Sequence, residues 1–370
     1  MYLILSSEFP PHSGGIGTCA YKLSKNILDQ SIVLSASSRS DSKNRLDKDG
    51  VDIIRSSGRG VFNRFLFFVF NIFFMIKKYN INKVIIFDHR SFVFFSIADF
   101  FLFNKKRSVY YYGHGSEFVK TDFASSLFRF FLRKSDATIL CNSRYTKGLI
   151  TSTIRKDSYV VLLGGEMFKT SRVEKTDELN YIHKKYQKYN KVVLTVGRVD
   201  NRKGQDMIIN LINDNLDDFR DILFVLAGPV NKKFWSRLKS QVPESVLVLN
   251  EVDLTTLEFI YSNSDFYLQP SRFDSDNGEV EGFGIAVCDA IHSGLIPIVS
   301  SHGGMREVLG GGLEQFVLKE NNLESLAQVL RSTINLQQGE VEEYRQLLSR
   351  RASELSWENS RYKFERILRL

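Results

Sequence analysis

Two carboxylates and a group of glycines in the second half of the chain form the segment with the most evident chemistry. Glu281 is followed by Gly282, Phe283 and Gly284, and Asp289 comes eight residues after Glu281. Glycines at the start of a helix expose backbone N–H groups to an anion. Asp289 lies about two turns into the helix that would follow, so both carboxylates can face one ligand. One carboxylate would suit the hydroxyls of a sugar and the other those of a ribose.

A second motif supplies positive charge. Arg198 and Lys203 lie in a short segment that begins at Gly197 and ends at Gly204. A guanidinium binds phosphate oxygens as a fork and an ammonium binds them as a point charge, so the pair could converge on a diphosphate. Such a pair would neutralise a departing diphosphate. A solvated turn is the alternative, and the bracketing glycines argue against it.

Two weaker motifs lie in the first half of the chain. Gly14 and Gly15 precede a predicted helix, where backbone N–H groups can face an anion; a plain turn is the alternative. His114 stands between two glycines directly after a predicted strand. A histidine there faces a cleft and can donate to a hydroxyl or carry a proton, although a structural histidine is the alternative.

These motifs must be positioned by strands and helices that alternate along the chain, which is typical of βαβ units on a parallel sheet. In the first half we expect strands at 2–6, 32–35, 51–55, 83–87, 107–111, 137–140 and 159–163, and helices at 16–28, 62–78, 92–101, 125–133 and 144–150. In the second half we expect strands at 192–196, 222–227, 246–249, 266–269, 296–299 and 315–318, and helices at 205–211, 232–240, 254–262, 284–293, 323–334 and 340–354.

A chain of 370 residues is too long for one ordinary core, so two domains are expected. The predicted boundary gives domains at 1–170 and 171–355, and the tail 356–370 forms a helix that crosses back to the first domain. Doubly wound sheets bind ligands beyond the carboxyl ends of their strands. Each motif above follows a predicted strand, so the expected site lies in a cleft that the two domains face.

The composition excludes several classes of protein. With 43% hydrophobic and 25% charged residues, the chain is typical of a soluble globular protein. Its three cysteines are odd in number and far apart, which indicates a reducing compartment. No basic stretch precedes the first apolar residues, and no apolar run reaches the roughly 18–20 residues of a spanning helix. We therefore expect a cytoplasmic protein.

Positive charge is concentrated in the first half. Residues 1–180 hold 27 Lys+Arg and 16 Asp+Glu, a net charge of +11, and the remaining residues hold 23 and 26, a net charge of −3. A basic half favours contact with phosphates, with an anionic membrane or with nucleic acid, and simple solvation is the alternative. The Phe-rich helices at 62–78 and 92–103 favour a lipid-linked acceptor at the inner membrane face; helix–sheet core is the equal alternative. No nucleic-acid module is recognisable.

Taken together, the motifs resemble those of the retaining glycosyltransferases of family 4, which have the GT-B fold. In the second half these are Gly197-Arg198-x-Asp200, Lys203-Gly204, Pro270-Ser271-Arg272, Glu281-Gly282-Phe283-Gly284, the segment 294–299, and Gly303-Gly304 with Glu307. In the first half they are Gly14-Gly15, His114-Gly115-x-Glu117 and the segment 142–146, and Trp357 resembles the family's late tryptophan. The resemblance extends over nearly the whole chain.

The resemblance implies two Rossmann-like α/β domains and a role for each motif. The catalytic set is then His114, Arg198, Lys203 and Glu281, and the donor-binding set is Gly14, Gly15, Arg198, Lys203, Glu281, Gly282, Phe283, Gly284, Ile285 and Asp289. Within these sets, Arg198 and Lys203 hold the donor diphosphate and Glu281 contacts the transferred sugar. Asp289 contacts the ribose, and His114 lies beside the reacting sugar.

The function implied is a retaining hexosyltransferase that uses a nucleotide-diphosphate sugar without metal or other cofactor. Its acceptor would be a glycan or a lipid-linked hydroxyl, and the setting would be bacterial surface polysaccharide assembly (O-antigen, capsule or lipopolysaccharide). Peripheral contact with an anionic membrane is expected, and nucleic acid is not an expected partner. A GT-B-like epimerase or phosphorylase and a non-catalytic sugar-nucleotide-binding protein are the alternatives.

Two residues depart from the family pattern, and one motif suggests a different site. Asp289 stands where the family usually has Glu, and Gly164-Gly165 replaces the usual Asn-Gly pair. The triplet Asp274-Ser275-Asp276 has the form of an Asp-x-Asp metal motif. Because Arg198 and Lys203 already supply positive charge, we expect this triplet to be a polar loop instead.

Overall fold

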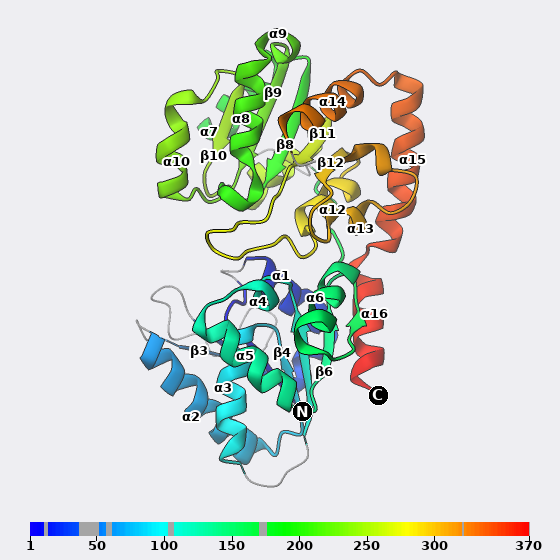
Figure 1. The fold of residues 1–370 in the computed structure, drawn as a ribbon. Helices are drawn as coiled ribbons and strands as arrows, with labels where there is room; N and C mark the ends of the chain where they lie inside the picture. Colours follow the sequence, from blue (N-terminus) through cyan, green and yellow to red (C-terminus); the bar gives the residue numbers. More distant parts are fainter. Residues whose placement is uncertain are drawn as a thin grey trace. The chain divides into compact units, whose positions relative to one another are not determined.

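The chain folds into two compact units (Figure 1). Unit 1 comprises Met1–Leu163 with Trp357–Leu370, and unit 2 comprises Gly164–Ser356. In this computed structural model the described residues are 1–10, 14–36, 52–56, 61–102, 107–169, 176–319 and 322–369. The segment 37–50, a loop by sequence, therefore lies outside the described residues, as does Val51 of the predicted strand 51–55.

Unit 1 is built on a parallel sheet with the strand order β3-β2-β1-β4-β5-β6-β7. The strands are β1 (Tyr2–Ser6), β2 (Ser31–Ala36), β3 (Asp52–Ser56), β4 (Lys83–Ile86), β5 (Ser108–Gly113), β6 (Thr138–Cys141) and β7 (Tyr159–Val160). The helices are α1 (Gly15–Ser24), η1 (Lys25–Gln30), α2 (Val61–Tyr79), α3 (His89–Phe100), α4 (Ser116–Val119), α5 (Phe123–Lys134), α6 (Arg144–Ile154) and α16 (Trp357–Leu368). The central strands are continuous apolar runs because both faces of the sheet are covered.

Helices cover the two faces of this sheet. Apolar side chains of α2, α3, α5 and α6 form one buried cluster with alternate strand residues such as Leu3, Leu5 and Ile86. Phe87 follows Ile86 and points to the opposite face, where its ring lies 6.1 Å from that of Phe364 in α16. The terminal helix therefore belongs to the first unit.

Unit 2 repeats the design with a parallel sheet of order β10-β9-β8-β11-β12-β13. The strands are β8 (Lys191–Val196), β9 (Ile222–Ala227), β10 (Val246–Leu249), β11 (Phe266–Gln269), β12 (Ile296–Ser300) and β13 (Val317–Leu318). The helices are α7 (Asp177–Tyr186), η2 (Asn201–Lys203), α8 (Gln205–Asp214), α9 (Leu216–Phe219), α10 (Lys232–Leu238), η3 (Lys239–Gln241), α11 (Leu254–Ser262), α12 (Ile285–His292), α13 (Met305–Leu309), η4 (Glu314–Phe316), α14 (Leu323–Ile334) and α15 (Gln338–Glu354).

The predicted alternation is confirmed, and the differences lie at the ends of elements and in short helices that were not predicted, such as α4, α9 and α13. The helix predicted at 92–101 begins at His89, because the Asp88 carboxylate accepts hydrogen bonds from the N–H groups of Arg90 and Ser91 and so caps the helix. The first half of the strand predicted at 315–318 belongs to the 3₁₀ turn η4, and only Val317–Leu318 pairs with β12. Within the described residues, no helix combines the length and apolar character needed to cross a bilayer.

Candidate functional site

The carboxyl edge of the second sheet is shaped by glycines that allow loops to touch. Gly204 has φ +76°, and a Cβ there would lie 2.3 Å from the carbonyl oxygen of Pro270. Gly303 also has φ +76°, and its Cβ would lie 2.1 Å from the carbonyl oxygen of Glu281. Any side chain at either position would clash with backbone. The loops after β8, β11 and β12 are therefore held against one another at this edge.

Glu281 lies at the centre of these loops and is paired with two cations. Its Oε2 is 2.8 Å from Nζ of Lys203 and also pairs with the guanidinium of Arg202. All three side chains are close to fully buried. Burial alone would raise the pKa of Glu281, but the two cations outweigh it and lower this pKa to about 2. Glu281 is therefore a carboxylate throughout the physiological pH range.

The two cations respond differently to the same environment. Burial lowers the pKa of Lys203, and Glu281 only partly offsets this effect. Burial acts against the charged form of Arg202 too, but the carboxylates of Glu281, Asp200 and Glu279 outweigh it and raise its pKa. Arg202 is thus the fixed positive charge of the pair.

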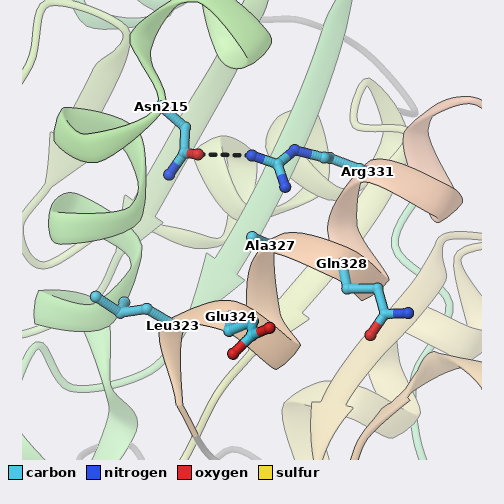
Figure 2. A pocket seen from close by; sticks show the side chains of 6 residues that line it. All are labelled: Asn215, Leu323, Glu324, Ala327, Gln328 and Arg331. Carbon is cyan, nitrogen blue, oxygen red and sulfur yellow. Dashed lines mark hydrogen bonds between the residues drawn. The ribbon is translucent and has the colours of Figure 1, made fainter.

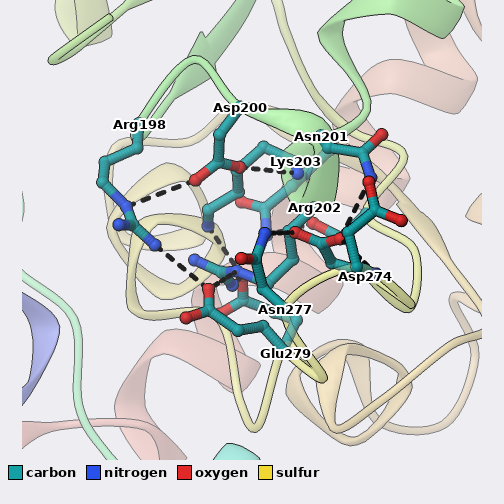
Figure 3. A network of polar contacts seen from close by, with 12 residues as sticks. Arg198, Asp200, Asn201, Arg202, Lys203, Asp274, Asn277 and Glu279 are labelled. Atoms are coloured by element: carbon teal, nitrogen blue, oxygen red, sulfur yellow. Dashed lines mark hydrogen bonds and ion pairs between the residues drawn. The ribbon is translucent and has the colours of Figure 1, made fainter. Parts of the chain in front are cut away.

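Arg198 is the accessible cation of the group, with a side chain that is 57% exposed. Its Nε lies 3.3 Å from Asp200, and its Nη2 lies 3.3 Å from Oε2 of Glu279 (Figure 3). The same oxygen of Glu279 lies 3.7 Å from Nε of Arg202. Glu279 therefore bridges an exposed guanidinium and a buried one.

A tight hairpin positions Glu279. Asp274 and Glu279 exchange two backbone hydrogen bonds, of 2.9 and 3.1 Å, across the turn between them. The carboxylate of Asp274 is buried and accepts from the side-chain amides of Asn201, at 3.1 Å, and Asn277, at 2.8 Å. Burial alone would raise the pKa of Asp274, but these hydrogen bonds outweigh it and lower this pKa.

The same hairpin contains the Asp-x-Asp triplet. Asp274 is occupied by the turn, and Asp276 is exposed. Within the part of the chain that the structure describes, no cluster of three His, Cys, Asp or Glu side chains has the geometry to hold a metal ion. The contacts of Asp274 give the triplet a structural role in the turn.

The expected helix after Glu281 is α12, and Gly284 occupies its N-cap with φ +105° and no side-chain cap. Phe283 is buried and anchors this turn, and Gly282 beside it is buried too. Ile285 opens the helix. The backbone N–H groups of its first turn are therefore not capped by a side chain.

Asp289, further along α12, makes a contact that the sequence did not predict. Its Oδ1 accepts a hydrogen bond of 2.8 Å from the N–H group of Glu166, at the start of unit 2. Next to it, a Cβ on Gly165 would lie 2.5 Å from the carbonyl carbon of Cys288, so glycine is required for this close approach. In this structure Asp289 thus ties α12 to the segment that enters the unit, a role that the short side chain of Asp fits.

In unit 1 the predicted residues lie at the carboxyl edge of the first sheet. Gly14 and Gly15 begin α1 without a side-chain cap, and the N–H group of Gly14 donates to Oε2 of Glu8 at 2.9 Å. His114 follows β5, its N–H group donates to Glu117 at 2.6 Å, and its Nε2 lies 2.8 Å from the carbonyl oxygen of Phe87.

His114 is neutral at physiological pH, because burial lowers the pKa of its imidazole. A carbonyl partner requires that Nε2 carries the hydrogen, so Nδ1 is the acceptor of the ring. In this tautomer the ring can accept a hydrogen bond from a hydroxyl through Nδ1. Its Nε2–H is already used.

Sequence reasoning did not assign roles to Arg202, Glu279 or Asp200. Arg202 lies in the cationic segment between Gly197 and Gly204, and Asp200 lies in the Gly-Arg-x-Asp motif. The sequence therefore contained a signal for both residues. Asp200 caps η2 by accepting from the N–H group of Lys203 at 3.1 Å. Glu279 gave no signal, because its partners are about 80 residues away and meet it only through the fold.

The structure also contains a separate hollow of about 570 Å³ beside α14 (Figure 2). It is lined by Asn215, Leu323, Glu324, Ala327, Gln328 and Arg331. Arg331 donates to Asn215 at 2.6 Å and pairs with Asp218 at 2.7 Å, so its charge is engaged. This hollow shares no residue with the network around Glu281.

Comparisons with known proteins show which families and folds the chain resembles. Residues 179–354 match the family model described as glycosyl transferases group 1. An uncharacterized 41.2 kDa protein in the cps region of Klebsiella pneumoniae is 25% identical over 335 residues, which cover 86% of this chain and 87% of that protein. Glycogen synthase of Lactiplantibacillus plantarum is 28% identical over 121 residues, which cover 32% of this chain and 24% of the synthase. The match thus spans only about a quarter of that relative's length.

A solved structure extends the likeness to the whole fold. HepE of Anabaena, in complex with UDP and glucose, aligns with a TM-score of 0.79 at 15% identity, over 99% of this chain and 98% of that chain. At this identity the likeness shows the fold alone. The chain therefore has the GT-B fold of two Rossmann-like α/β units, and the match to the glycosyl transferases group 1 model lies within its second unit.

Proposed function

We propose that this protein is a retaining glycosyltransferase that moves a hexose from a nucleotide-diphosphate sugar to a hydroxyl group. The observation that carries the proposal is the ionised, buried Glu281 between Lys203 and Arg202, with the exposed Arg198 beside them. A glycosyl transferases group 1 domain supports a transferase. HepE, which has the same fold, was solved with UDP and glucose, and this supports a nucleotide-sugar donor.

In the proposed reaction, Arg198 and Lys203 bind the diphosphate of the donor. Negative charge accumulates on the leaving phosphate as its bond to the sugar breaks, and fixed cations stabilise charge that develops in this way. The exposed Arg198 would offer the diphosphate a fork of N–H donors, and the less exposed Lys203 would offer it a point charge. The chain needs no metal ion for this task.

Glu281 is poorly suited to accept a proton, because its pKa of about 2 makes it a weak base. Its carboxylate is better suited to hydrogen-bond the hydroxyls of the transferred sugar. The proton of the acceptor would pass to the leaving diphosphate, as the acceptor attacks the anomeric carbon from the same face. The sugar is then transferred with its anomeric configuration retained, and no protein nucleophile is required.

The remaining assignments follow from the same proposal. His114 would accept a hydrogen bond from the reacting sugar through Nδ1, and the amides at Gly14 and Gly15 would lie near the phosphates. Asp289 would contact the ribose with the carboxylate that also holds Glu166. The likeness to a protein of a cps region supports an acceptor in bacterial surface polysaccharide assembly, either a glycan or a lipid-linked sugar. Transfer to a lipid-linked acceptor would place the protein at the inner face of the cell membrane.

A panel of nucleotide sugars tests the donor. Ligand binding to the folded state alone raises the melting temperature with the logarithm of ligand excess, so the true donor should give the largest shift. The selected donor is then incubated with candidate acceptors, and the products are separated. A new glycoside is expected. An epimerised sugar nucleotide would support the epimerase alternative. Donor binding with neither turnover nor slow hydrolysis of the donor would support a non-catalytic protein.

A further inference from the structure

Helix α2 has two apolar faces, and only one of them is buried. Phe68, Ile72, Met75 and Ile76 point into the core cluster of unit 1 and are at most 3% exposed. A helix that covers a sheet needs one such apolar face to pack against it. The opposite face of such a helix is ordinarily polar, because it meets water.

The outer face of α2 is instead a stripe of large apolar side chains. Leu66, Phe70 and Phe74 follow one another at four-residue intervals and are 49%, 68% and 50% exposed. Residues spaced by four are neighbours on a helix surface, and the rings of Phe70 and Phe74 stack with centroids 6.5 Å apart. Contiguous exposed apolar surface of this kind marks a binding surface rather than ordinary solvent contact.

The helices beside α2 continue this pattern. α2 packs against α3, and α3 packs against α5, in the helix layer of unit 1 (Figure 1). Phe123 and Phe130 of α5 are exposed, and so are Phe100 and Phe101 at the end of α3. Of the seven phenylalanines that are exposed among the described residues, six belong to this layer. The enrichment is therefore a property of this layer rather than of the surface as a whole.

The charges of these helices are almost all positive. α2, α3 and α5 contain Arg64, Lys77, Lys78, Arg90, Arg129, Arg133 and Lys134, and their one acid is Asp99. Asp99 is already paired with Arg107. At the end of the α2 stripe, Nζ of Lys78 lies 5.6 Å from the ring of Phe74, and Nζ of Lys77 lies 4.3 Å from the ring of Phe73.

We propose that the outer stripe of α2, formed by Leu66, Phe70 and Phe74 with Lys77 and Lys78, docks unit 1 on an anionic lipid surface. Aromatic and aliphatic side chains enter the boundary of the acyl chains, and the ammonium groups beside them reach the lipid phosphates. The scarcity of acids matches a negative surface, and α2 lies in the interface rather than across it, because it is not apolar enough to span a bilayer. This deepens the proposed function by naming the surface that would bring the protein to a lipid-linked acceptor.

Vesicle co-sedimentation of the full chain tests the proposal without donor or acceptor. Binding to vesicles of phosphatidylglycerol and phosphatidylcholine is expected, and little binding to phosphatidylcholine alone. The double substitution Phe70→Ser with Phe74→Ser should weaken binding by about tenfold or more, because two large apolar side chains no longer insert. Lys77→Glu or Lys78→Glu should each cost at least about fivefold and reduce the sensitivity to salt.

A matched control is Leu254→Ser, which removes an exposed apolar side chain of unit 2 and should leave vesicle binding unchanged. Circular dichroism and the melting temperature check that each variant folds. Unchanged vesicle binding of the Phe70→Ser, Phe74→Ser protein would overturn the proposal, as would equal binding to neutral vesicles. A wild-type dimer that these substitutions convert to a monomer would show instead that a second copy covers the stripe. Donor-induced thermal shifts, measured in parallel, report separately on the proposed transferase site.

Discussion

The carboxyl edges of the two sheets fix their charged groups in different ways. In unit 1, Asp88 accepts from the N–H groups of Ser7 and Ser91, and Glu117 accepts from the hydroxyl of Tyr111 and the N–H group of His114. These two carboxylates are held by neutral donors. In unit 2, three carboxylates are held by three cations instead.

This difference shows at which edge the anion of a ligand can take the place of a carboxylate of the protein. Hydrogen bonds from backbone N–H groups and side-chain hydroxyls fix the carboxylates of unit 1 as part of the fold. In the network of unit 2 each cation already contacts a carboxylate, so we expect an incoming diphosphate to replace a carboxylate on at least one cation. Arg198 is the cation best placed for this exchange, because it is half exposed and its partners are 3.3 Å away. Lys203 and Arg202 are paired with Glu281 and are less exposed, and in the proposed site Lys203 adds its charge to the diphosphate while it keeps this pair.

The largest effect is expected from removing Glu281. Glu281→Ala leaves Arg202 and Lys203 buried without their shared partner, and breaking a buried pair in this way costs about 3–5 kcal/mol. Urea unfolding should show this loss. Glu279→Gln is the control, because it removes a carboxylate that is more exposed, and it should cost about 1 kcal/mol or less. Equal losses in the two variants would remove the distinction between a fixed and an exchangeable carboxylate.

Substitutions of Arg198 and Lys203 should both lower activity but should differ in their effect on stability. Arg198→Ala and Lys203→Ala should each lower kcat by about 10²–10³, the range for losing a donor that stabilises developing charge. Only Lys203→Ala should also lower the melting temperature, since it uncovers one side of the buried Glu281. Steady-state kinetics and thermal unfolding measure the two effects. Full turnover in either variant would contradict the assignment of the diphosphate site.

Acid should destabilise unit 2 through Glu281. Its pKa falls from 4.5 to about 2 on folding, so its contribution to stability is complete above pH 4.5 and is lost as the pH falls toward 2. The shift corresponds to a contribution on the order of 3 kcal/mol. Unfolding of wild type and Glu281→Gln is compared across this range. The difference between the two should shrink with falling pH; a constant difference would mean that the charge of Glu281 does not matter.

The smallest effect is expected on pyrophosphate binding when the contact between Arg198 and Glu279 is weakened. Glu279→Gln removes the negative charge that bridges Arg198 and Arg202, so inorganic pyrophosphate should bind a few-fold more tightly. Isothermal titration calorimetry with pyrophosphate measures this without knowledge of the nucleobase. Asp276→Asn, which alters an exposed acid of the same hairpin, serves as the control. Weaker binding to Glu279→Gln would indicate that Glu279 organises the site instead of competing for it.

Much of the fold was predictable because it depends on local pattern. Apolar runs between turns gave the strands, and their alternation with amphipathic stretches gave the two parallel sheets. The length of α3 was underestimated at its start, since the capping role of Asp88 depends on the side chain's direction. The boundary of the last strand was overestimated because an apolar run fits a 3₁₀ turn as well as a strand.

The sequence singled out Arg198, Lys203 and Glu281 as candidates, but it did not predict how their side chains pair. The sequence grouped Arg198 with Lys203, and the structure groups Lys203 with Arg202 through Glu281, which lies almost 80 residues away. Spacing along the chain cannot show which of three nearby cations points inward. The Phe-rich helix posed the same problem, because phenylalanines on all sides do not reveal which face is covered. Only the packing of Phe68 and Ile72 against the sheet leaves Phe70 and Phe74 outside.

Proton NMR of the transfer reaction tests most directly whether the cation network of unit 2 supports retaining transfer to an acceptor. The donor selected by thermal shift is mixed with acceptor and protein, and the anomeric signals of donor and product are followed with time. The product should form with the anomeric configuration of the donor, and it should form about 10²–10³ times more slowly in Arg198→Ala. An inverted product, or transfer at the wild-type rate without Arg198, would contradict the proposed site and mechanism.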